Sequence, residues 1–543
     1  MQFGSHSRSP QADQERLRAI QAALARGDMA AAGEAAARAM AQGLEHPLVL
    51  SLAAGRLEAA GRLNDALALL VRAKRLAPQD AGVRNALGIC LSRSGRHEEA
   101  IGEFSAAVAL EPALASAYAA RAHARVALAR LNEARGDFEQ ALTIEPRNPF
   151  ALGGLASLAL RRGDAAEARR LAAGALEIAP EYPDAALTLA GACIAAGEPG
   201  AAEAQLQDLL ASPRPQPLER AIGEGLLGDA LDAQGRFPEA FSAYTSANAR
   251  MRAIYRPSFE GRQTTLAFIR DLARHLEGRR LPPPAAPASG GPARTHVFLA
   301  GFPRSGTTLL EQVLEEHPDT VTLAEKECMI DAGRALMSSR DRFDALLALP
   351  DAQLEPYRAA YWKRVAEEGV DVRDKVFVDK HPFHSFKLPL IARLFPEARI
   401  LVARRDPRDI VLSCFRYRFE MTDPMYQMLT LEGTAELFDA AMALIEATRD
   451  AFGRDLLDCA NEALVADFDG ETKRICGWLG IAWSEGMRDF ASNVGARGVF
   501  TPSAAQIAGG LSGSGVGKWR DYAQQLAPVL PRLEPWVRRF GYS

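Results

Sequence analysis

The chain has 543 residues, of which 48% are hydrophobic and 24% charged, and its formal net charge is −4. These proportions are typical of soluble globular proteins and exclude a disordered or collagen-like chain. The near-neutral balance indicates neither a nucleic-acid nor a membrane partner, and no uncharged apolar run approaches the roughly 18 residues that cross a bilayer. Six cysteines lie far apart without a Cys-x-x-Cys pair, which suits reduced thiols and leads us to expect a cytoplasmic location.

Prolines recur every 34 residues in the first half of the chain, at Pro78, Pro112, Pro146 and Pro180. Alanines stand 12 and five residues before each proline, and a further small residue lies earlier in each unit. Small residues let two helices cross closely, and proline ends a unit because it cannot continue a helix. The pattern predicts two antiparallel helices per unit and, with less regular units at both ends, about seven units over residues 10–255.

This 34-residue pattern resembles the tetratricopeptide repeat, which implies an all-α superhelix with a concave groove. We expect a protein or peptide to bind in that groove. A passive spacer and a dimerisation arm are the alternative interpretations of such an array.

Residues 256–294 are predicted to be a helical and proline-rich linker. The segment Leu281–Pro292 contains three consecutive prolines and a Gly-Gly pair, which forbid a continuing helix and favour an extended spacer. All five tryptophans follow residue 360, so the composition changes across this segment. We therefore expect a separate domain at residues 295–543.

A buried β-strand is predicted at Thr295–Ala300, followed by a glycine loop at Gly301–Thr308 and then a helix. The free N–H groups and the dipole at the start of such a helix attract an anion. The loop reads Gly-x4-Gly followed by Thr307, where a nucleotide triphosphatase carries lysine, and Arg304 lies inside the loop. The missing lysine argues against a kinase acting on a small molecule.

Two further strands are predicted at residues 375–380 and 398–403, with Lys380 and Arg405 at their carboxyl ends, and a short strand is predicted at Thr320–Leu323. Strands that alternate with helices predict a parallel sheet with crossover connections. Ligands of such sheets bind outside the carboxyl ends of the strands. Arg304, Lys380 and Arg405 are therefore expected to meet around one ligand that carries several anionic groups.

The motifs Phe302–Leu309, Asp379–Pro382 and Arg405–Ser413 resemble those of the sulfotransferase family, especially its tyrosylprotein sulfotransferase branch. The resemblance covers about residues 295–543 and implies a P-loop-like α/β domain with a parallel sheet. The whole chain is thus expected to be α + α/β, with the all-α repeats first. The family's donor is 3′-phosphoadenylyl sulfate, PAPS, and the resemblance implies no metal.

By this resemblance, the loop would hold the 5′-phosphosulfate of PAPS, while a forked arginine and a serine hydroxyl would hold its 3′-phosphate. Residues near the C-terminus would contact the donor as well. The expected donor-binding residues are Arg304, Ser305, Gly306, Thr307, Thr308, Arg405, Ser413, Lys518 and Trp519.

The expected catalytic residues, again by resemblance, are Glu325, Lys380, Arg304 and Ser503. Glu325 would accept the proton of the acceptor hydroxyl, within hydrogen-bond reach of it. Lys380 and Arg304 would stabilise charge on the bridging oxygen, and Ser503 would lie near the transferring group. Glu327 is a rival base.

Two positions depart from the family's pattern. Glu327 stands where the tyrosylprotein branch has an arginine for acidic peptides, and Asn461 stands where a tyrosine is usual. The predicted function is transfer of a sulfuryl group from PAPS to a hydroxyl acceptor, such as a protein tyrosine, with the repeats recruiting a partner or substrate. The alternative is a repeat-based protein-binding scaffold whose second domain binds nucleotide but is catalytically weak.

Overall fold

A computed structural model of the chain describes residues 10–262, 264–281, 291–491, 510–511, 513 and 515–543. The chain divides into two compact units, residues 1–160 with 164–192 and residues 193–543 with 161–163. The division falls inside helix α11 (Pro183–Ala195), so the helices that follow α11 belong to the same unit as the sheet described below.

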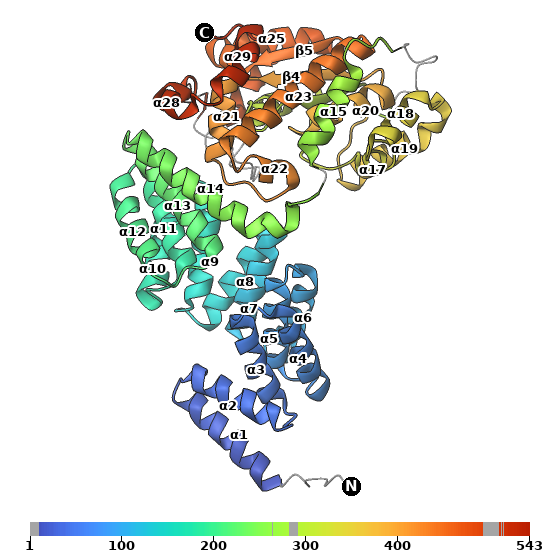
Figure 1. Ribbon diagram of the computed structural model, residues 1–543. Coiled ribbons are helices and arrows are strands. Elements are labelled where there is room, and N and C mark those ends of the chain that lie inside the picture. The colour runs from blue at the N-terminus through green and yellow to red at the C-terminus, as the bar shows by residue number, and fades with distance from the viewer. Residues whose placement is uncertain (1–9, 263, 282–290, 492–509, 512, 514) are drawn as a thin grey trace. The chain divides into compact units, whose positions relative to one another are not determined.

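The described residues before 260 form fourteen helices that follow one another as seven consecutive pairs (Figure 1). The predicted all-α repeat array is thereby confirmed, and the prolines at 34-residue intervals each lie between two pairs. The helices are α1 Pro10–Ala25, α2 Met29–Ala41, α3 Pro47–Ala59, α4 Leu63–Leu76, α5 Ala81–Arg93, α6 His97–Leu110, α7 Ala115–Ala127, α8 Leu131–Ile144, α9 Pro149–Arg161, α10 Ala165–Ile178, α11, α12 Pro199–Ala211, α13 Pro217–Ala233 and α14 Phe237–Phe259.

Close packing within a pair depends on a small residue that faces an aromatic ring 16 positions later. A Cβ atom added to Gly88 in α5 would lie 2.5 Å from the ring of Phe104 in α6. In the same way, a Cβ atom on Gly228 in α13 would lie 2.5 Å from the ring of Tyr244 in α14. Protein interiors have no spare room for such atoms, so the last pair has the interface of the regular repeats although its sequence is less regular.

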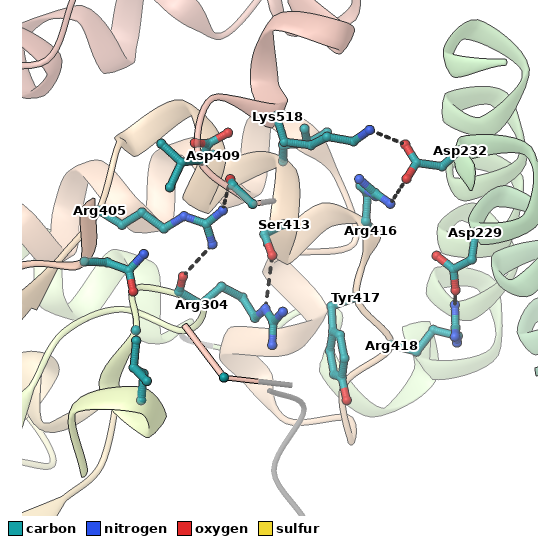
Figure 2. Close-up of a pocket in the computed structure, with 17 residues that line it drawn as sticks. Asp229, Asp232, Arg304, Arg405, Asp409, Ser413, Arg416, Tyr417, Arg418 and Lys518 are labelled. Carbon is teal, nitrogen blue, oxygen red and sulfur yellow. Dashed lines mark hydrogen bonds and ion pairs between the residues drawn. The ribbon is translucent and has the colours of Figure 1, made fainter. Parts of the chain in front are cut away.

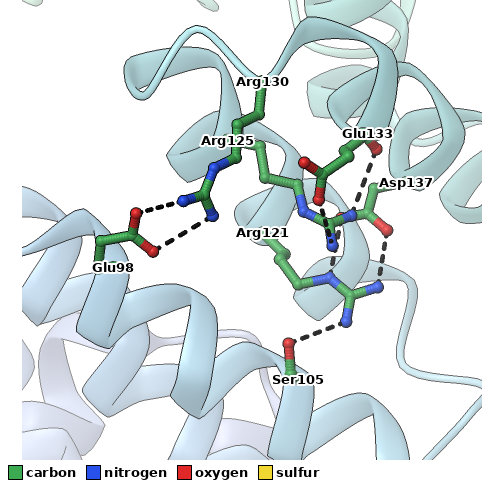
Figure 3. Close-up of polar contacts among 7 residues, drawn as sticks. All are labelled: Glu98, Ser105, Arg121, Arg125, Arg130, Glu133 and Asp137. Carbon is green, nitrogen blue, oxygen red and sulfur yellow. Dashed lines mark hydrogen bonds and ion pairs between the residues drawn. The ribbon is translucent and has the colours of Figure 1, made fainter. Parts of the chain in front are cut away.

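Polar contacts of the α7–α8 pair are shown in Figure 3. The buried carboxylate of Asp137 in α8 accepts hydrogen bonds from Arg121 at 2.7 and 2.8 Å and from Arg125 at 2.7 Å, both in α7. Arg121 also donates to Ser105 Oγ in α6 at 3.1 Å. A buried carboxylate needs such partners, and Arg121 thereby links the α7–α8 pair to the preceding α5–α6 pair.

Helix α15 (Thr265–Leu276) lies in the range predicted as a linker, and its apolar face is part of the core of the second unit. Thr264 caps it, because its hydroxyl accepts a hydrogen bond from Ala267 N at 3.2 Å. The buried side chains of α15 are Leu266, Ile269, Leu272, Ala273, His275 and Leu276. The proline-rich residues 282–290 lie outside the described part of the chain.

Five parallel strands form the sheet, in the order β2-β3-β1-β4-β5. The strands are β1 Thr295–Ala300, β2 Thr320–Ala324, β3 Val376–Lys380, β4 Arg399–Arg404 and β5 Leu456–Ala460. The predicted parallel sheet is confirmed, and β5 is a strand that the sequence did not predict. Because the strands are parallel, their carboxyl ends share one edge, which positions the site.

Alternate residues of each strand enter the two cores on either face of the sheet. Phe298 and Phe377 pack on the side covered by α15, α20 (His384–Leu394) and α23 (Leu431–Phe452). Val297 and Val378 pack on the side covered by α16 (Thr307–Glu315) and α25 (Phe468–Leu479). Strands buried on both faces are typical of parallel sheets.

Shorter helices complete the second unit, and none of the helices that the structure describes is both long and apolar enough to span a bilayer. The shorter helices are α17 Ile330–Leu336, α18 Arg340–Ala348, η1 Asp351–Gln353, α19 Glu355–Glu367, α21 Pro407–Arg416, α22 Asp423–Gln427, α24 Asn461–Ala466, η2 Glu485–Asp489, η3 Lys518–Tyr522, α28 Ala523–Leu526 and α29 Leu530–Arg539.

Candidate active site

The loop between β1 and α16 has a tight backbone that depends on its glycines. A Cβ atom on Gly301 would lie 2.6 Å from Ser305 Oγ, which itself accepts a hydrogen bond from the loop's own backbone. Gly306 caps α16 with a φ of 100°, and a Cβ atom there would lie 2.8 Å from Asn461 Oδ1. Arg304 has a φ of 69°, which is strained for a residue with a side chain. The expected donor loop is therefore a constrained turn.

The first turn of α16 follows this loop directly. Thr307 and Thr308 are the first two residues of the helix, and both are buried. The unpaired N–H groups and the positive dipole end of a helix favour an anion at this place. The backbone thus has the shape that phosphate-binding loops use, with no lysine at position 307.

A pocket of about 510 Å³ opens beside the loop, as Figure 2 shows. Its lining comes from the loop, from α21 and the residues after it, from α13, and from the segment around residue 515. Ionisable side chains dominate this lining, with more cations than carboxylates. They are Arg304, Arg405, Arg416, Arg418 and Lys518, together with Asp229, Asp232 and Asp409.

Arg304, Arg405 and Ser413, which were expected to meet on one ligand, line this pocket together. Arg304 Nε donates to Ser413 Oγ at 3.0 Å, and Arg405 Nη1 donates to the carbonyl oxygen of Arg304 at 3.2 Å. The Arg304 guanidinium lies over the ring of Tyr417, 5.1 Å from its centroid. Burial lowers the pKa of Arg304 from its usual value. Among the described residues, Arg405 Nε is buried and has no hydrogen-bond partner, so this N–H suits an acceptor oxygen of a ligand.

The segment at Lys518 and Trp519 is anchored to α21. Asp409 accepts hydrogen bonds from Gly517 N at 2.7 Å and from Trp519 N at 2.8 Å. Lys518 lines the pocket, whereas Trp519 lies beside it, with the Arg408 guanidinium 3.9 Å from its ring centroid. The indole Nε1 of Trp519 is also buried and has no partner in the part of the chain that the structure describes.

Lys380 does not line the pocket but belongs to a neighbouring charge cluster. Its fully buried ammonium lies 2.7 Å from Glu325 Oε1 and 2.9 Å from Glu311 Oε2. Glu325 has a side chain that is 40% exposed and a strained φ of 52°. The sequence predicted Lys380 and Glu325 as catalytic residues, and the structure brings these two into contact.

Glu311 of α16 is a member of this cluster that the sequence analysis missed. Its side chain is 2% exposed, and burial raises the pKa of its carboxyl while Lys380 acts in the opposite direction. The sequence signal that could have identified it is an acidic residue four positions after Thr307, on the helix face that also carries buried apolar side chains. Such a residue is buried only with a partner.

Glu327, the rival base, is paired with another cation. It forms an ion pair with Lys387, and its other carboxylate oxygen lies 3.5 Å from His381 Nε2. Burial raises the pKa of Glu327, but the ion pair with Lys387 outweighs this and lowers it, and burial lowers the pKa of His381 to about 4. His317 has both ring nitrogens within hydrogen-bonding distance of backbone atoms, at 2.6 Å from Ala482 O and 3.1 Å from Asp319 N.

A buried polar chain stands behind Lys380 on the other face of β3. The Tyr361 hydroxyl donates to Asp379 Oδ2 at 2.8 Å, and His384 Nε2 lies 2.9 Å from Asp379 Oδ1. His296 Nε2 lies 2.9 Å from the same tyrosine hydroxyl. All four side chains are buried, so they fix the end of β3 from which Lys380 projects.

Ser503, together with the rest of the motif Thr501–Ser503, lies outside the described residues. Among the residues that are described, no three His, Cys, Asp or Glu side chains come close enough to hold a metal ion.

A parallel sheet whose central strand runs into a glycine turn, a helix N-terminus and a cationic pocket defines a P-loop-like α/β domain. Residues 296–485 match the model of the sulfotransferase family. Residues 52–115, 119–186 and 159–218 match models of the tetratricopeptide repeat. The chain thus carries a sulfotransferase-family domain after tetratricopeptide repeats.

Several relatives share parts of the chain. An uncharacterised protein of Aquifex aeolicus is 24% identical over 352 residues, which are 62% of this chain and 44% of that protein. Protein-tyrosine sulfotransferase 2 of Gallus gallus is 25% identical over 46% of this chain and 69% of its own. Nodulation protein NoeE of Sinorhizobium fredii is 30% identical over 21% of this chain and 30% of its own. The chain therefore spans less than half the length of the Aquifex relative.

Solved structures align with part of the chain. A tetratricopeptide repeat protein from Parabacteroides merdae has a TM-score of 0.34 and 20% identity, over 44% of this chain and 93% of its own. A thermophilic repeat protein from Thermus thermophilus has a TM-score of 0.30 and 22% identity, over 36% of this chain and 98% of its own.

Proposed function

We propose that this protein is a PAPS-dependent sulfotransferase that transfers a sulfuryl group to a hydroxyl acceptor. The observation that carries the proposal is the pocket in which the strained loop residue Arg304 meets Arg405 and Ser413, beside the Lys380–Glu325 pair. Two arginines, a hydroxyl group and a helix N-terminus suit a ligand that carries phosphate groups.

The chemistry of the donor set fits PAPS. The turn at Gly301–Gly306 leaves backbone N–H groups accessible at the start of α16, which suits the 5′-phosphosulfate. Arg405 has a buried Nε without a partner among the described residues, and Ser413 offers a hydroxyl group from α21, the helix that follows Arg405. This pair suits the 3′-phosphate. When bound, PAPS supplies an activated sulfuryl group with a good leaving group.

Glu325 is the proposed base. The acceptor oxygen forms a bond to sulfur while the bond between sulfur and the bridging oxygen breaks, and the hydroxyl proton moves to the Glu325 carboxylate. Lys380 and Arg304 are proposed to stabilise the negative charge that develops on the bridging oxygen. A protonated Glu325 no longer attracts Lys380, so proton uptake frees the ammonium for this role. Glu311, 2.9 Å from the ammonium, remains its partner.

The repeats are proposed to bind a protein or peptide and bring it to the enzyme, and the cytoplasm is the proposed location. Helix pairs that stack through small residues leave a concave surface for such a partner. The acceptor is proposed to be a hydroxyl compound such as a protein tyrosine, without a requirement for acidic neighbours, because Glu327 adds negative charge beside Glu325.

A scaffold that binds nucleotide but transfers sulfate only weakly is the second candidate. The observation that favours it is the contact of Glu325 with Lys380, because the ammonium occupies a carboxylate oxygen that would otherwise accept the hydroxyl proton. The chain would then bind nucleotide and a protein without turnover.

Two measurements test the proposal. Calorimetry with 3′-phosphoadenosine 5′-phosphate, PAP, should show binding to the full chain, and loss of binding in Arg405→Ala would place it in this pocket. Incubation with radiolabelled PAPS and candidate acceptors should transfer label. Glu325→Gln should abolish transfer and keep PAP binding, whereas Glu327→Gln is the matched control. Transfer that survives in Glu325→Gln and stops in Glu327→Gln would reassign the base, and PAP binding without transfer to any acceptor would favour the scaffold.

A further inference from the structure

Three cations on the α13 side of the pocket are paired with two aspartates of that helix. We call them the outer cations: Arg416, Arg418 and Lys518. Asp232 Oδ2 lies 2.7 Å from Arg416 Nη2, and its Oδ1 lies 3.3 Å from Lys518 Nζ. Asp229 Oδ2 lies 3.1 Å from Arg418 Nη1. All five side chains line the same pocket, as Figure 2 shows. Two carboxylates therefore face three cations, and the Asp232 carboxylate is shared between two of them.

Arg405, on the loop side of the pocket, has hydrogen bonds of another kind. It donates to the backbone carbonyl oxygens of Arg304 and Gly515. Carbonyl groups orient a guanidinium without cancelling its charge, whereas a carboxylate in contact with a cation cancels most of the field that an incoming anion would feel. Arg405 is therefore more available to a phosphate than the outer cations are.

Each of the two aspartates also has a tyrosine hydroxyl as a further partner. The Tyr244 hydroxyl donates to Asp229 Oδ1 at 2.9 Å, and the Tyr522 hydroxyl donates to Asp232. A carboxylate that gives up its cation to a phosphate would keep one hydrogen-bond donor. The free-energy penalty for a buried carboxylate without a partner is thereby reduced. The outer cations can therefore pair either with the aspartates or with a phosphate.

We infer that Asp229 and Asp232 compete with the phosphate groups of the ligand for Arg416, Arg418 and Lys518, and so set the affinity and charge specificity of the pocket. The inference rests on the proposed function in so far as the ligand is a bisphosphorylated nucleotide. Arg416 lies three residues after Ser413 in α21, so the outer cations adjoin the place proposed for the 3′-phosphate. The repeat-array helix α13 is then part of the nucleotide site.

The test uses the full chain and calorimetry with three probes: PAP, AMP, which lacks the 3′-phosphate, and inorganic pyrophosphate. Asp232→Asn removes the charge and keeps a hydrogen-bonding group, and Asp229→Asn does the same at a more exposed pair. Glu224→Gln is the matched control, because Glu224 also lies in α13 and pairs with an arginine, Arg250 at 2.8 Å, but does not line the pocket.

We expect Asp232→Asn to bind PAP roughly fivefold more tightly than the wild-type chain, as removal of one nearby negative charge predicts. AMP binding should change less, and Glu224→Gln should bind as the wild type does. Unchanged or weaker PAP binding in both Asp229→Asn and Asp232→Asn, with thermal unfolding showing folded protein, overturns the inference while the donor proposal stands.

Pyrophosphate separates the two proposals. If the wild-type chain binds no PAP but Asp232→Asn tightens pyrophosphate binding, the donor proposal fails and the competition is retained. If neither probe binds, both proposals fail.

Discussion

Lys380 and Glu325 are joined twice at the carboxyl edge of the sheet. The ammonium of Lys380 lies 2.7 Å from Glu325 Oε1, and Glu325 N donates to the carbonyl oxygen of Lys380 at 2.7 Å. The backbone bond follows the register of β2 beside β3, in which Ala324 stands next to Lys380. The position of the proposed base is thus set by the sheet itself and not by a surface loop.

Loss of the Lys380 ammonium should destabilise the protein through Glu311. Lys380→Met leaves a carboxylate that is 2% exposed without its cation, and we expect a loss of about 3 kcal/mol in the free energy of unfolding. Urea unfolding, followed by circular dichroism, measures this. The double variant Lys380→Met, Glu311→Gln should regain part of the loss, and a double variant as unstable as the single one would contradict the pairing.

Acid should destabilise the protein through His296. Burial lowers the pKa of His296 to about 3, whereas its ordinary value is 6.5. The unfolded chain therefore binds a proton that the folded chain does not as pH falls from about 6.5 to 3, and stability decreases by up to about 1.4 kcal/mol per pH unit in this window. His296→Gln should flatten the decrease of the unfolding midpoint over this range, and an unchanged slope would show that other groups cause it.

Gly306→Ala should impair the donor pocket without unfolding the domain. The left-handed φ of 100° is costly for alanine, and the added Cβ atom would lie 2.8 Å from Asn461 Oδ1. We expect PAP binding to weaken by roughly tenfold or more, since a shift of the loop of about 1 Å misplaces its N–H groups. Gly477→Ala is the control, because a Cβ atom there has open space, and it should bind PAP as before.

The α/β domain should need helices α13 and α14 in order to fold. Tyr244 and Ala240 of α14 belong to the same core cluster as the sheet, and Phe241 of α14 stacks on Phe415 at 5.2 Å. A fragment that begins at Pro199 should be soluble and bind PAP, whereas a fragment that begins at Gly261, which keeps α15 but lacks α13 and α14, should aggregate. Gel filtration and calorimetry compare the two, and a soluble, PAP-binding fragment from Gly261 would contradict this expectation.

Local patterns were sufficient to predict the helix pairs and four of the five strands. The strands ending at Ala300 and Lys380 are rich in β-branched and aromatic residues, and the repeats recur at a fixed interval. Strand β5, Leu456–Ala460, was not predicted because it has neither β-branched nor aromatic residues.

Long-range placement explains what else the sequence did not predict. Arg304, Arg405 and Lys380 were expected together because all of them follow strand ends, and Ser413 was expected beside Arg405 by the family resemblance. Arg304, Arg405 and Ser413 line one pocket, whereas Lys380 does not. Asp229 and Asp232 come from a helix that precedes the loop by more than 60 residues, and no local pattern connects such residues with it. The topology of the fold, not a motif, brings them to the pocket.

The side chain of Trp519 has a practical use. Its indole contacts the Arg408 guanidinium, its backbone is tied to Asp409, and its neighbour Lys518 lines the pocket. Indole fluorescence responds to nearby charge, so a ligand that shifts this segment would alter the emission of the protein. With Trp519→Phe as the blank, the chain carries its own optical reporter of ligand binding, with no label attached.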